Sequence, residues 1–387
     1  MKSADETTMP DPRLVPEPEV RRRFRGCLVG GAVGDALGAP VEFMRRGEIL
    51  RHFGPDGIRD MAPAYGRVGA ITDDTQMALF TAEGVLRAYV RHASRGICSP
   101  PGVIAYAYQR WLHTQGVGHE LQSGHLNGWL VTRKELHARR APGLTCLSAL
   151  EGMNSAGTPA KNDSKGCGGI MRVAPIGMLY AALGGADPAD AQSRSAEAFQ
   201  LGCEASALTH GHPTGRLAAG AFAAIVCGIL QGMTIAAAAE HALQLLERSD
   251  AHEETSSAMR DAILLAHEAP RSAAALARLG EGWIAEEALA IGLYCALCAE
   301  DFESALMLAV NHDGDSDSTG LIAGSLLGAA LGAEVISPRW LEPLELREVI
   351  EEVADDLATA PRWPLDEEDE IKAIELRAHY VSRYPGG

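Results

Sequence analysis

The sequence predicts an all-α fold, a compact single-domain helical bundle, from three observations. Apolar residues recur at three- and four-residue steps, as in Leu79, Ala82, Leu86 and Val90. Alternating β-branched runs bounded by turn residues are almost absent, which argues against a parallel-sheet fold. The 387 residues, 47% of them hydrophobic, are enough to bury a large core.

Charge and cysteine usage exclude several classes of protein. The chain has 34 Lys and Arg against 51 Asp and Glu, a formal charge of −17. Such a surface repels phosphate backbones, so we expect no nucleic-acid partner, and the polar content argues against membrane spans. The first 20 residues lack the layout of a signal peptide, and the eight cysteines are scattered as in a reduced protein. We therefore expect a cytoplasmic protein.

The chain divides into three parts by composition. Residues 1–20 are polar, acidic and proline-bearing, and they are predicted to form a flexible extension. Residues 21–360 are predicted to form one helical domain, and 361–387 a last helix and tail. A break rich in Gly, Pro, Ser and Asn runs from 139 to 169 and is predicted to be a loop. A loop of this length inside a helical domain is more often functional or mobile than accidental.

Two helical segments carry glycine at every fourth position. They are Gly26, Gly30, Gly34 and Gly38, and Gly320, Gly324, Gly328 and Gly332. Four glycines in one helix cost on the order of 3–4 kcal/mol relative to alanine, so close packing or a site must compensate. The same spacing mediates membrane-helix dimerisation, but Asp35, Pro40 and Glu42 interrupt the first segment. We therefore predict two tightly packed central helices.

Two clusters of acids and hydroxyls each stand before a helical segment. Thr72-Asp73-Asp74-Thr75 precedes the helical run from Met77, and taken alone it is explained as a capped helix start with acids that complement the dipole. The second cluster, 312–319, precedes the second glycine-rich segment and holds more acids and hydroxyls than capping requires. It lacks the glycine and glutamate of an EF-hand loop, so calcium of that type is excluded.

Together the two clusters predict one composite site for cations. Carboxylates that meet without a counter-charge repel one another, and hard divalent ions relieve that repulsion. Oxygen-only ligands favour Mg²⁺, Mn²⁺ or Ca²⁺ over zinc, and four or more carboxylates can hold two ions roughly 3.5–4 Å apart. We predict a binuclear metal site at helix N-termini. Cys295 and Cys298 form a C-x-x-C without a second pair and are interpreted as helix core.

With these motifs the chain resembles the ADP-ribosylglycohydrolase family, whose founding type is the dinitrogenase reductase-activating glycohydrolase. The resemblance runs through five ordered blocks: GCLVGGAVGDALGAPVEF at 26–43, ITDDTQMAL at 71–79, RRAPGLTCLSAL at 139–150, SKGCGGIMRVAPIGM at 164–178 with LTHGHP at 208–213, and NHDGDSDSTGLIAGSLLGA at 311–329. It implies two Mg²⁺ or Mn²⁺ ions, with Thr72, Asp73, Asp74, Asp315, Asp317 and Ser318 as ligands.

The resemblance also implies roles outside the ligand set. Glu42 matches an acidic position that some members use in catalysis or gating, with Asp74 and Asp315 as further catalytic acids; the alternative for Glu42 is a solvated acid that ends the first helix. Asp35 is expected to support the site. Gly166, Cys167, Gly168 and Gly169 match a loop that wraps the ADP-ribose diphosphate, although many members carry Asn in place of Cys167. His210 matches a histidine near the substrate, or else a capping or core residue.

The reaction implied is hydrolysis of the glycosidic bond between ADP-ribose and a protein side chain, with arginine as the first choice of acceptor. The alternatives are hydrolysis of serine-linked ADP-ribose or of O-acetyl-ADP-ribose, and a non-catalytic protein that only binds ADP-ribose. Such a non-catalytic protein would be expected to lack acids of the metal site. Some relatives are immunity proteins against ADP-ribosylating toxins, and residues 1–20 could block such a partner or be a disordered tail. A nucleoside hydrolase would need a sheet-based fold. The expected partner is an ADP-ribosylated protein.

Overall fold

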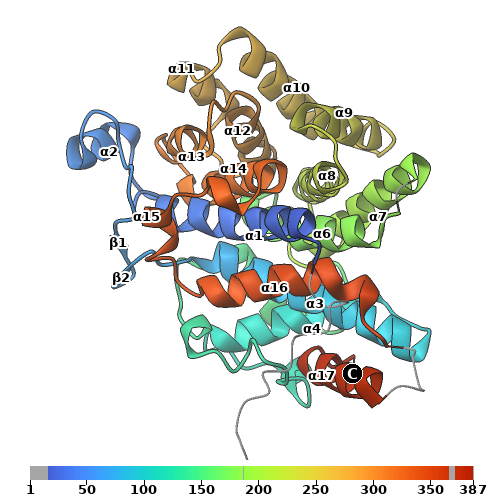
Figure 1. The fold of residues 1–387 in the computed structure, drawn as a ribbon. Helices are drawn as coiled ribbons and strands as arrows, with labels where there is room; N and C mark the ends of the chain where they lie inside the picture. The colour runs from blue at the N-terminus through green and yellow to red at the C-terminus, as the bar shows by residue number, and fades with distance from the viewer. Residues whose placement is uncertain (1–15, 186, 366–370, 387) are drawn as a thin grey trace, which may run out of the picture.

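The computed structural model describes residues 16–185, 187–365 and 371–386, and Figure 1 shows helices packed on helices throughout this part of the chain. The predicted all-α fold is confirmed. The α-helices are α1 (Pro18–Gly38), α2 (Arg46–Phe53), α3 (Asp73–Arg95), α4 (Pro100–Thr114), α5 (Leu144–Glu151), α6 (Ala174–Leu183), α7 (Pro188–Ala207), α8 (Pro213–Leu230), α9 (Ile235–Leu246), α10 (Glu253–Glu268), α11 (Ala273–Leu276), α12 (Ala285–Leu297), α13 (Phe302–Val310), α14 (Ser316–Leu331), α15 (Pro338–Leu341), α16 (Arg347–Thr359) and α17 (Ile371–Arg383).

Short elements complete the described chain. The strands β1 (Pro63–Ala64) and β2 (Arg67–Val68) pair antiparallel, and Tyr65 and Gly66 between them both have positive φ, as a tight two-residue hairpin turn requires. Single turns of 3₁₀-helix are η2 (Glu120–Gln122), η3 (Lys134–Leu136), η4 (Cys167–Gly169), η5 (Ala277–Leu279), η6 (Ala333–Val335) and η7 (Ala360–Arg362). None of these strands builds a layer of its own.

The two glycine-rich segments are α1 and α14, which cross the centre of the molecule side by side (Figure 1). Their backbones touch in antiparallel order along the whole stripe, from Gly26 beside Gly328 to Gly38 beside Ser316. A Cβ added to Gly30 would lie 2.5 Å from the carbonyl oxygen of Gly324. This direct backbone contact confirms the predicted pair of tightly packed helices and explains why glycine recurs in both.

The helix α8 is a buried apolar helix around which several other helices pack. It packs against α6, α7, α9, α12 and α14, and all of its residues from Leu217 to Ile229 are buried. Among the described residues it is the one helix long and apolar enough to cross a membrane, but 83% of it is buried inside the fold. Burial by other helices accounts for its apolar composition. Cys295 on α12 and Cys298, directly after the end of α12, also belong to this core, as predicted.

The segment 139–169 differs from the predicted loop because it contains the two-turn helix α5. Cys146, Leu147 and Leu150 bury one face of α5 against the core. The helical spacing of these three residues overrides the surrounding Gly, Pro and Ser, which had suggested irregular structure. The 3₁₀ turn η4 ends the segment beside the acidic clusters.

The C-terminal helix α17 lies against α16 and the end of α3 (Figure 1). The ring of Trp363 stacks on Tyr380 with centroids 3.8 Å apart, and Arg383 donates a hydrogen bond to Asp356 at 2.8 Å. The predicted last helix is present. The domain boundaries at 20 and 360 stay predictions, with α1 beginning at Pro18, and most of the predicted extension, residues 1–15, lies outside the described residues.

The contact between α1 and α14 predicts a large cost for any side chain added to it. Gly30→Ala should destabilise the protein by about 3 kcal/mol, because a methyl group in a packed backbone contact forces the helices apart and exceeds the gain in helix propensity. Gly47→Ala on α2 is the matched control, since a Cβ there meets no atom within 4 Å. Urea unfolding of both variants measures the difference. Equal stabilities would contradict the packing account.

Candidate active site

The end of α1 and the start of α14 bring three acids together. Since Gly38 lies against Ser316, the chain that leaves α1 carries Glu42 to the N-terminus of α14. One carboxylate oxygen from each of Glu42, Asp315 and Asp317 lies within 4.8 Å of the other two. The three side chains are 7%, 3% and 2% exposed, so the negative charges meet with little water to screen them.

The N-terminus of α3 is fixed by an acid from α1. Asp35 accepts hydrogen bonds from the backbone N–H groups of Thr72 at 3.0 Å and Thr75 at 3.2 Å, and from the Thr75 hydroxyl. The Thr72 hydroxyl accepts the N–H of Asp74 at 3.2 Å, as a helix cap does. Asp35 therefore holds the start of α3 in place through its backbone, which agrees with the supporting role expected for it.

The two acidic clusters meet across this junction. The Ser318 hydroxyl donates to Asp74 at 2.7 Å and so links α14 to α3 directly. Asp73 accepts the backbone N–H of Gly143 at 3.2 Å, and Asp317 accepts the N–H of Ser318 at 3.0 Å. All six residues of the predicted ligand set thus lie at helix N-termini around one junction. The two clusters are at least 237 positions apart in sequence, and the packing of α1 against α14 brings them together.

A buried ion pair that the sequence analysis missed holds the segment directly before α3 in place. Arg140 pairs with Glu345, and the two side chains bond the carbonyl oxygen and the N–H of Ile71 respectively, at 2.7 and 3.2 Å. Arg67 also pairs with Glu345. Arg140 lies in one of the motif blocks, but its partner is 205 residues away, so its role was not apparent from the pattern.

The electrostatics of the cluster favour a bound cation. Burial, and next to it the charge of Asp317, raises the pKa of Asp35 to about 7 and that of Glu42 to about 11. The same two causes raise the pKa values of Asp73, Asp74 and Asp315 well above the usual range, and burial raises that of Asp317. Glu42 Oε2 is buried without a hydrogen-bond partner. Oxygen donors, dense negative charge and an unpartnered oxygen fit a hard divalent ion.

The glycine loop borders the carboxylates through its cysteine. Cys167 Sγ donates to Asp315 at 2.7 Å, and the Cys167 N–H donates to the carbonyl of Trp283 at 3.2 Å. A Cβ on Gly168 would lie 2.8 Å from Cys146 Sγ, and one on Gly169 would overlap the Ser206 side chain. Internal packing therefore already requires glycine at two of the four positions. Diphosphate binding by Gly166, Cys167, Gly168 and Gly169 stays a prediction.

His210 lies behind this loop and is only 1% exposed. Its Nδ1 is 2.8 Å from the Thr209 hydroxyl, and its ring packs under Gly168 and Gly169. Burial and the nearby Arg172 lower its pKa to about 3, so the imidazole is neutral. The histidine supports the loop from inside the fold, and contact with a substrate stays a prediction. Arg172 is fully buried over the ring of Tyr108, 4.3 Å from its centroid.

Three aromatic residues around the carboxylates were missed by the sequence analysis. Phe43 and Trp283 stack with ring centroids 5.9 Å apart and are 70% and 38% exposed. Tyr65, in the hairpin turn, has its pKa raised by burial and then by the charge of Glu42, which places it near the cluster. These residues come from loops without a periodic pattern. An aromatic residue directly after Glu42 was the one available signal.

Comparison with known proteins identifies the family. The sequence model of the ADP-ribosylglycohydrolase family matches residues 16–366. The chain belongs to this family. It is 28% identical over 343 residues to the ADP-ribosyl-[dinitrogen reductase] glycohydrolase of Rhodospirillum rubrum, covering 85% of this chain and 92% of that relative. It is 23% identical over 352 residues to the ADP-ribosylarginine hydrolase Tri1 of Pseudomonas putida (strain GB-1), covering 89% and 80%.

A solved structure agrees with this assignment. The fold is similar to a chain described as an ADP-ribosylglycohydrolase-related protein complex, with a TM-score of 0.62, 28% identity, and coverage of 88% of this chain and 99% of that one. This ADP-ribosylglycohydrolase is a hydrolase of ADP-ribosylated targets, and its buried acidic cluster suits the metal dependence general to the family.

The low pKa of His210 predicts loss of stability in acid. The unfolded chain, with a histidine pKa near 6.5, takes up a proton as the pH falls, while the folded chain with a pKa of about 3 does not. Protonation therefore favours unfolding, by about 2 kcal/mol between pH 7.5 and 5. Urea unfolding should show that the wild type loses this much more stability over the interval than His210→Asn. Identical pH dependence would contradict a buried neutral imidazole.

The crowded carboxylates predict opposite effects of one substitution with and without metal. Asp317→Asn should raise Tm in EDTA, because it removes the charge that opposes every neighbouring acid, and it should lose most of the rise in Tm that Mg²⁺ or Mn²⁺ causes. That rise corresponds to about 2.7 kcal/mol at 100 times Kd in the wild type. Asp313→Asn is the control, since Asp313 accepts the N–H of Arg46 instead. A full metal response in Asp317→Asn would disprove this role of the cluster.

Proposed function

We propose that this ADP-ribosylglycohydrolase removes ADP-ribose from arginine side chains with the help of two Mg²⁺ or Mn²⁺ ions. The observation that carries the proposal is the meeting of Glu42, Asp315 and Asp317 within 4.8 Å, where all three are buried and none is paired with a Lys or Arg of the described residues. Burying three carboxylates together costs stability. Carboxylates with strongly shifted pKa values concentrate at functional sites, which favours a functional role for this cluster.

The residues proposed to hold the ions are Thr72, Asp73, Asp74, Asp315, Asp317 and Ser318. When bound, divalent cations neutralise part of the negative charge and make water a stronger nucleophile at neutral pH. Asp74 is oriented by the Ser318 hydroxyl and Asp315 by the Cys167 thiol, so both carboxylates are held at fixed angles. Fixed carboxylates stabilise the positive charge that develops on the ribose carbon when a glycosidic bond breaks.

Glu42 is proposed as the proton-transfer residue, with Asp74 and Asp315 assisting. One of its oxygens is unpartnered, and it follows α1 on a connecting segment rather than in a helix. A carboxyl group in this position can hold the proton that a leaving nitrogen needs, or remove one from water. The loop 166–169 and His210 are proposed to bind the diphosphate side of the substrate, the loop by its backbone and His210 by supporting it.

Arginine as acceptor is supported by the aromatic surface beside Glu42 as well as by the name of the Pseudomonas relative. Phe43 and Trp283 present a stacked, exposed aromatic pair next to Glu42. Flat guanidinium groups stack on aromatic faces and are attracted to carboxylates, whereas a serine hydroxyl gains nothing from such a surface. The assay below separates arginine-linked from serine-linked ADP-ribose, and hydrolysis from binding alone. O-acetyl-ADP-ribose is the further alternative substrate.

A toxin partner and a cytoplasmic location are predictions of the same proposal. The toxin-blocking role depends on residues 1–20, of which 1–15 lie outside the described residues. The cytoplasmic location is supported by eight free cysteines spread over the fold, as expected in a reducing compartment.

The deciding experiment measures release of ADP-ribose from matched arginine-linked and serine-linked substrates. We expect release from the arginine linkage with Mg²⁺ or Mn²⁺, loss of that release in EDTA, and a decrease of at least 1,000-fold in Asp315→Ala, since removal of one catalytic group commonly costs several kcal/mol. Glu42→Gln should lower kcat more than it raises KM. Asp313→Asn changes a neighbouring acid that is not among the proposed ligands and accepts the N–H of Arg46, and it should keep the wild-type rate.

Other outcomes contradict parts of the proposal. Faster release from serine would overturn the choice of acceptor while leaving the metal site intact. Metal-dependent binding of ADP-ribose without release from any linkage would identify a reader. Full activity in EDTA and in Asp315→Ala would overturn the site itself.

A further inference from the structure

The segment 280–284, which leads into α12, contacts two parts of the site at once. The carbonyl oxygen of Glu281 accepts the N–H of Asp315 at 2.8 Å, and the carbonyl oxygen of Trp283 accepts the N–H of Cys167 at 3.2 Å. Asp315 belongs to the acidic cluster and Cys167 to the glycine loop. The segment therefore joins the acidic cluster to the glycine loop through backbone hydrogen bonds.

The segment fits closely against the start of α14. A Cβ added to Gly314 would overlap the carbonyl oxygen of Glu281, and one added to Gly282 would lie 2.9 Å from the Thr319 side chain. Gly282 and Gly314 have φ angles of +84° and +118°, which glycine adopts readily. Because the two backbones touch here, a displacement of the segment would also displace the first turn of α14.

The end of the segment pairs with the start of the glycine loop. Ile284 and Gly166 form an antiparallel bridge, and the N–H of Ala285 donates to the carbonyl oxygen of Lys165 at 2.8 Å. With the bond from Cys167 to the segment, three consecutive residues of the loop are held along their backbone. The position of the loop therefore depends on the position of the segment.

A carboxylate on α12 fixes the turn of this segment. Glu287 Oε2 accepts the N–H groups of Glu281 at 3.0 Å and Gly282 at 3.1 Å. Glu287 is the third residue of α12, so its side chain reaches back over the start of the helix as the acid of a capping box does. Hydrogen bonds to a carboxylate are stronger than those between neutral groups. The helix thus anchors Glu281, whose carbonyl oxygen bonds Asp315.

This anchor matters because the segment has little stiffness of its own. Gly280 and Gly282 both have positive φ, and glycine loses more conformational freedom on folding than other residues. Without Glu287, two backbone N–H groups lose their acceptor, and the segment can move away from α14. A misplacement of about 1 Å at a catalytic group can cost about 100-fold in rate. The Glu287 carboxylate can therefore affect catalysis through the backbone.

We propose that Glu287 is a positioning residue of the hydrolase. It holds the segment 280–284, and through that segment it sets the position of Asp315 relative to the glycine loop. The inference rests on the proposed function, in which Asp315 holds a metal ion and the loop 166–169 binds the diphosphate of the same substrate. Glu287 acts through two backbone N–H groups and touches neither the substrate nor the reacting atoms.

Hydrogen–deuterium exchange of the full chain in EDTA, resolved to the amides of Cys167 and Asp315, tests the inference without catalysis. In Glu287→Ala both amides should exchange at least about tenfold faster than in the wild type, because the carbonyl groups that they bond are no longer held. Glu287→Gln should restore wild-type exchange, since its amide oxygen can accept the same two N–H groups. Release of ADP-ribose should follow the same order, with kcat/KM at least about tenfold lower in Glu287→Ala and within about threefold of the wild type in Glu287→Gln.

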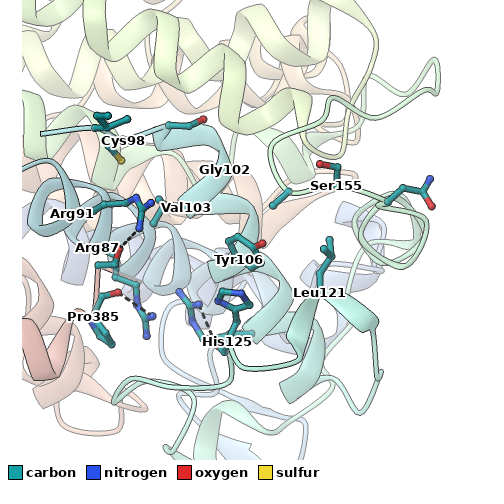
Figure 2. A pocket seen from close by; sticks show the side chains of 16 residues that line it. Arg87, Arg91, Cys98, Gly102, Val103, Tyr106, Leu121, His125, Ser155 and Pro385 are labelled. Carbon is teal, nitrogen blue, oxygen red and sulfur yellow. Dashed lines mark hydrogen bonds between the residues drawn. The ribbon is translucent and has the colours of Figure 1, made fainter. Parts of the chain in front are cut away.

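A destabilised control variant is available on α4. A cavity of about 610 Å³ opens between α3, α4 and the last described residues, and none of the described residues that line it belongs to the acidic cluster, the glycine loop or the segment 280–284 (Figure 2). There Tyr106 stacks on His125 with ring centroids 4.0 Å apart. Tyr106→Ala should lower Tm by removing this contact, and should leave the exchange of Cys167 and Asp315 and the rate of release within about twofold of the wild type. The comparison separates positioning from a general loss of stability.

Several results would overturn the inference. They are unchanged exchange of the two amides in Glu287→Ala, equally faster exchange throughout α8, exchange in Glu287→Gln as fast as in Glu287→Ala, or wild-type release by Glu287→Ala despite faster exchange. If Glu287→Ala does not fold, Glu287→Asp, whose carboxylate is one methylene shorter, is judged by the same measurements. Absence of release from every linkage in the wild type would overturn the proposed function and with it the role of Glu287 in catalysis, whereas the exchange would still show whether Glu287 holds the two amides.

Discussion

The direct backbone contact between α1 and α14 is the constraint on which the rest of the structure depends. Glycine at every fourth position lets the two helices approach until the carbonyl oxygen of one residue lies where a side chain would stand on the other. The contact continues to Gly38 and Ser316, so the C-terminal end of α1 and the N-terminal end of α14 are fixed within one turn of each other. A catalytic group at either of these two helix ends is therefore held in a fixed position relative to the other helix.

The acids of the site follow from this junction. Asp35, near the end of α1, binds the start of α3 by its backbone N–H groups and thereby brings Asp73 and Asp74 to Asp315 and Asp317. The carboxylates are then buried together and raise one another's pKa values. Burying like charges costs stability, and the rigid helix pair prevents them from moving apart. The fold therefore maintains a site that favours a cation, at the expense of the stability of the metal-free protein.

Sequence could predict the parts that depend on local pattern. Helical periodicity predicted the helices, and the four-residue glycine spacing predicted the central pair. The acids and hydroxyls before two helices predicted that the two clusters would meet, and their binding of metal ions stays a prediction. The parts it could not predict are contacts between loops far apart in the chain. The Cys167 thiol on Asp315, the stack of Phe43 on Trp283 and the Arg140–Glu345 pair join positions 148 to 240 residues apart, and no periodicity marks them. The helix α5 was missed because loop-forming residues surround its three buried positions.

The central claim is that the junction of α1, α3 and α14 is a metal centre. Diffraction from crystals soaked in Mn²⁺, measured at a wavelength where manganese scatters anomalously, tests it most directly. The account predicts anomalous peaks between Asp73, Asp74, Asp315 and Asp317. Crystals saturated with Mn²⁺ that show no anomalous density at this junction would contradict it.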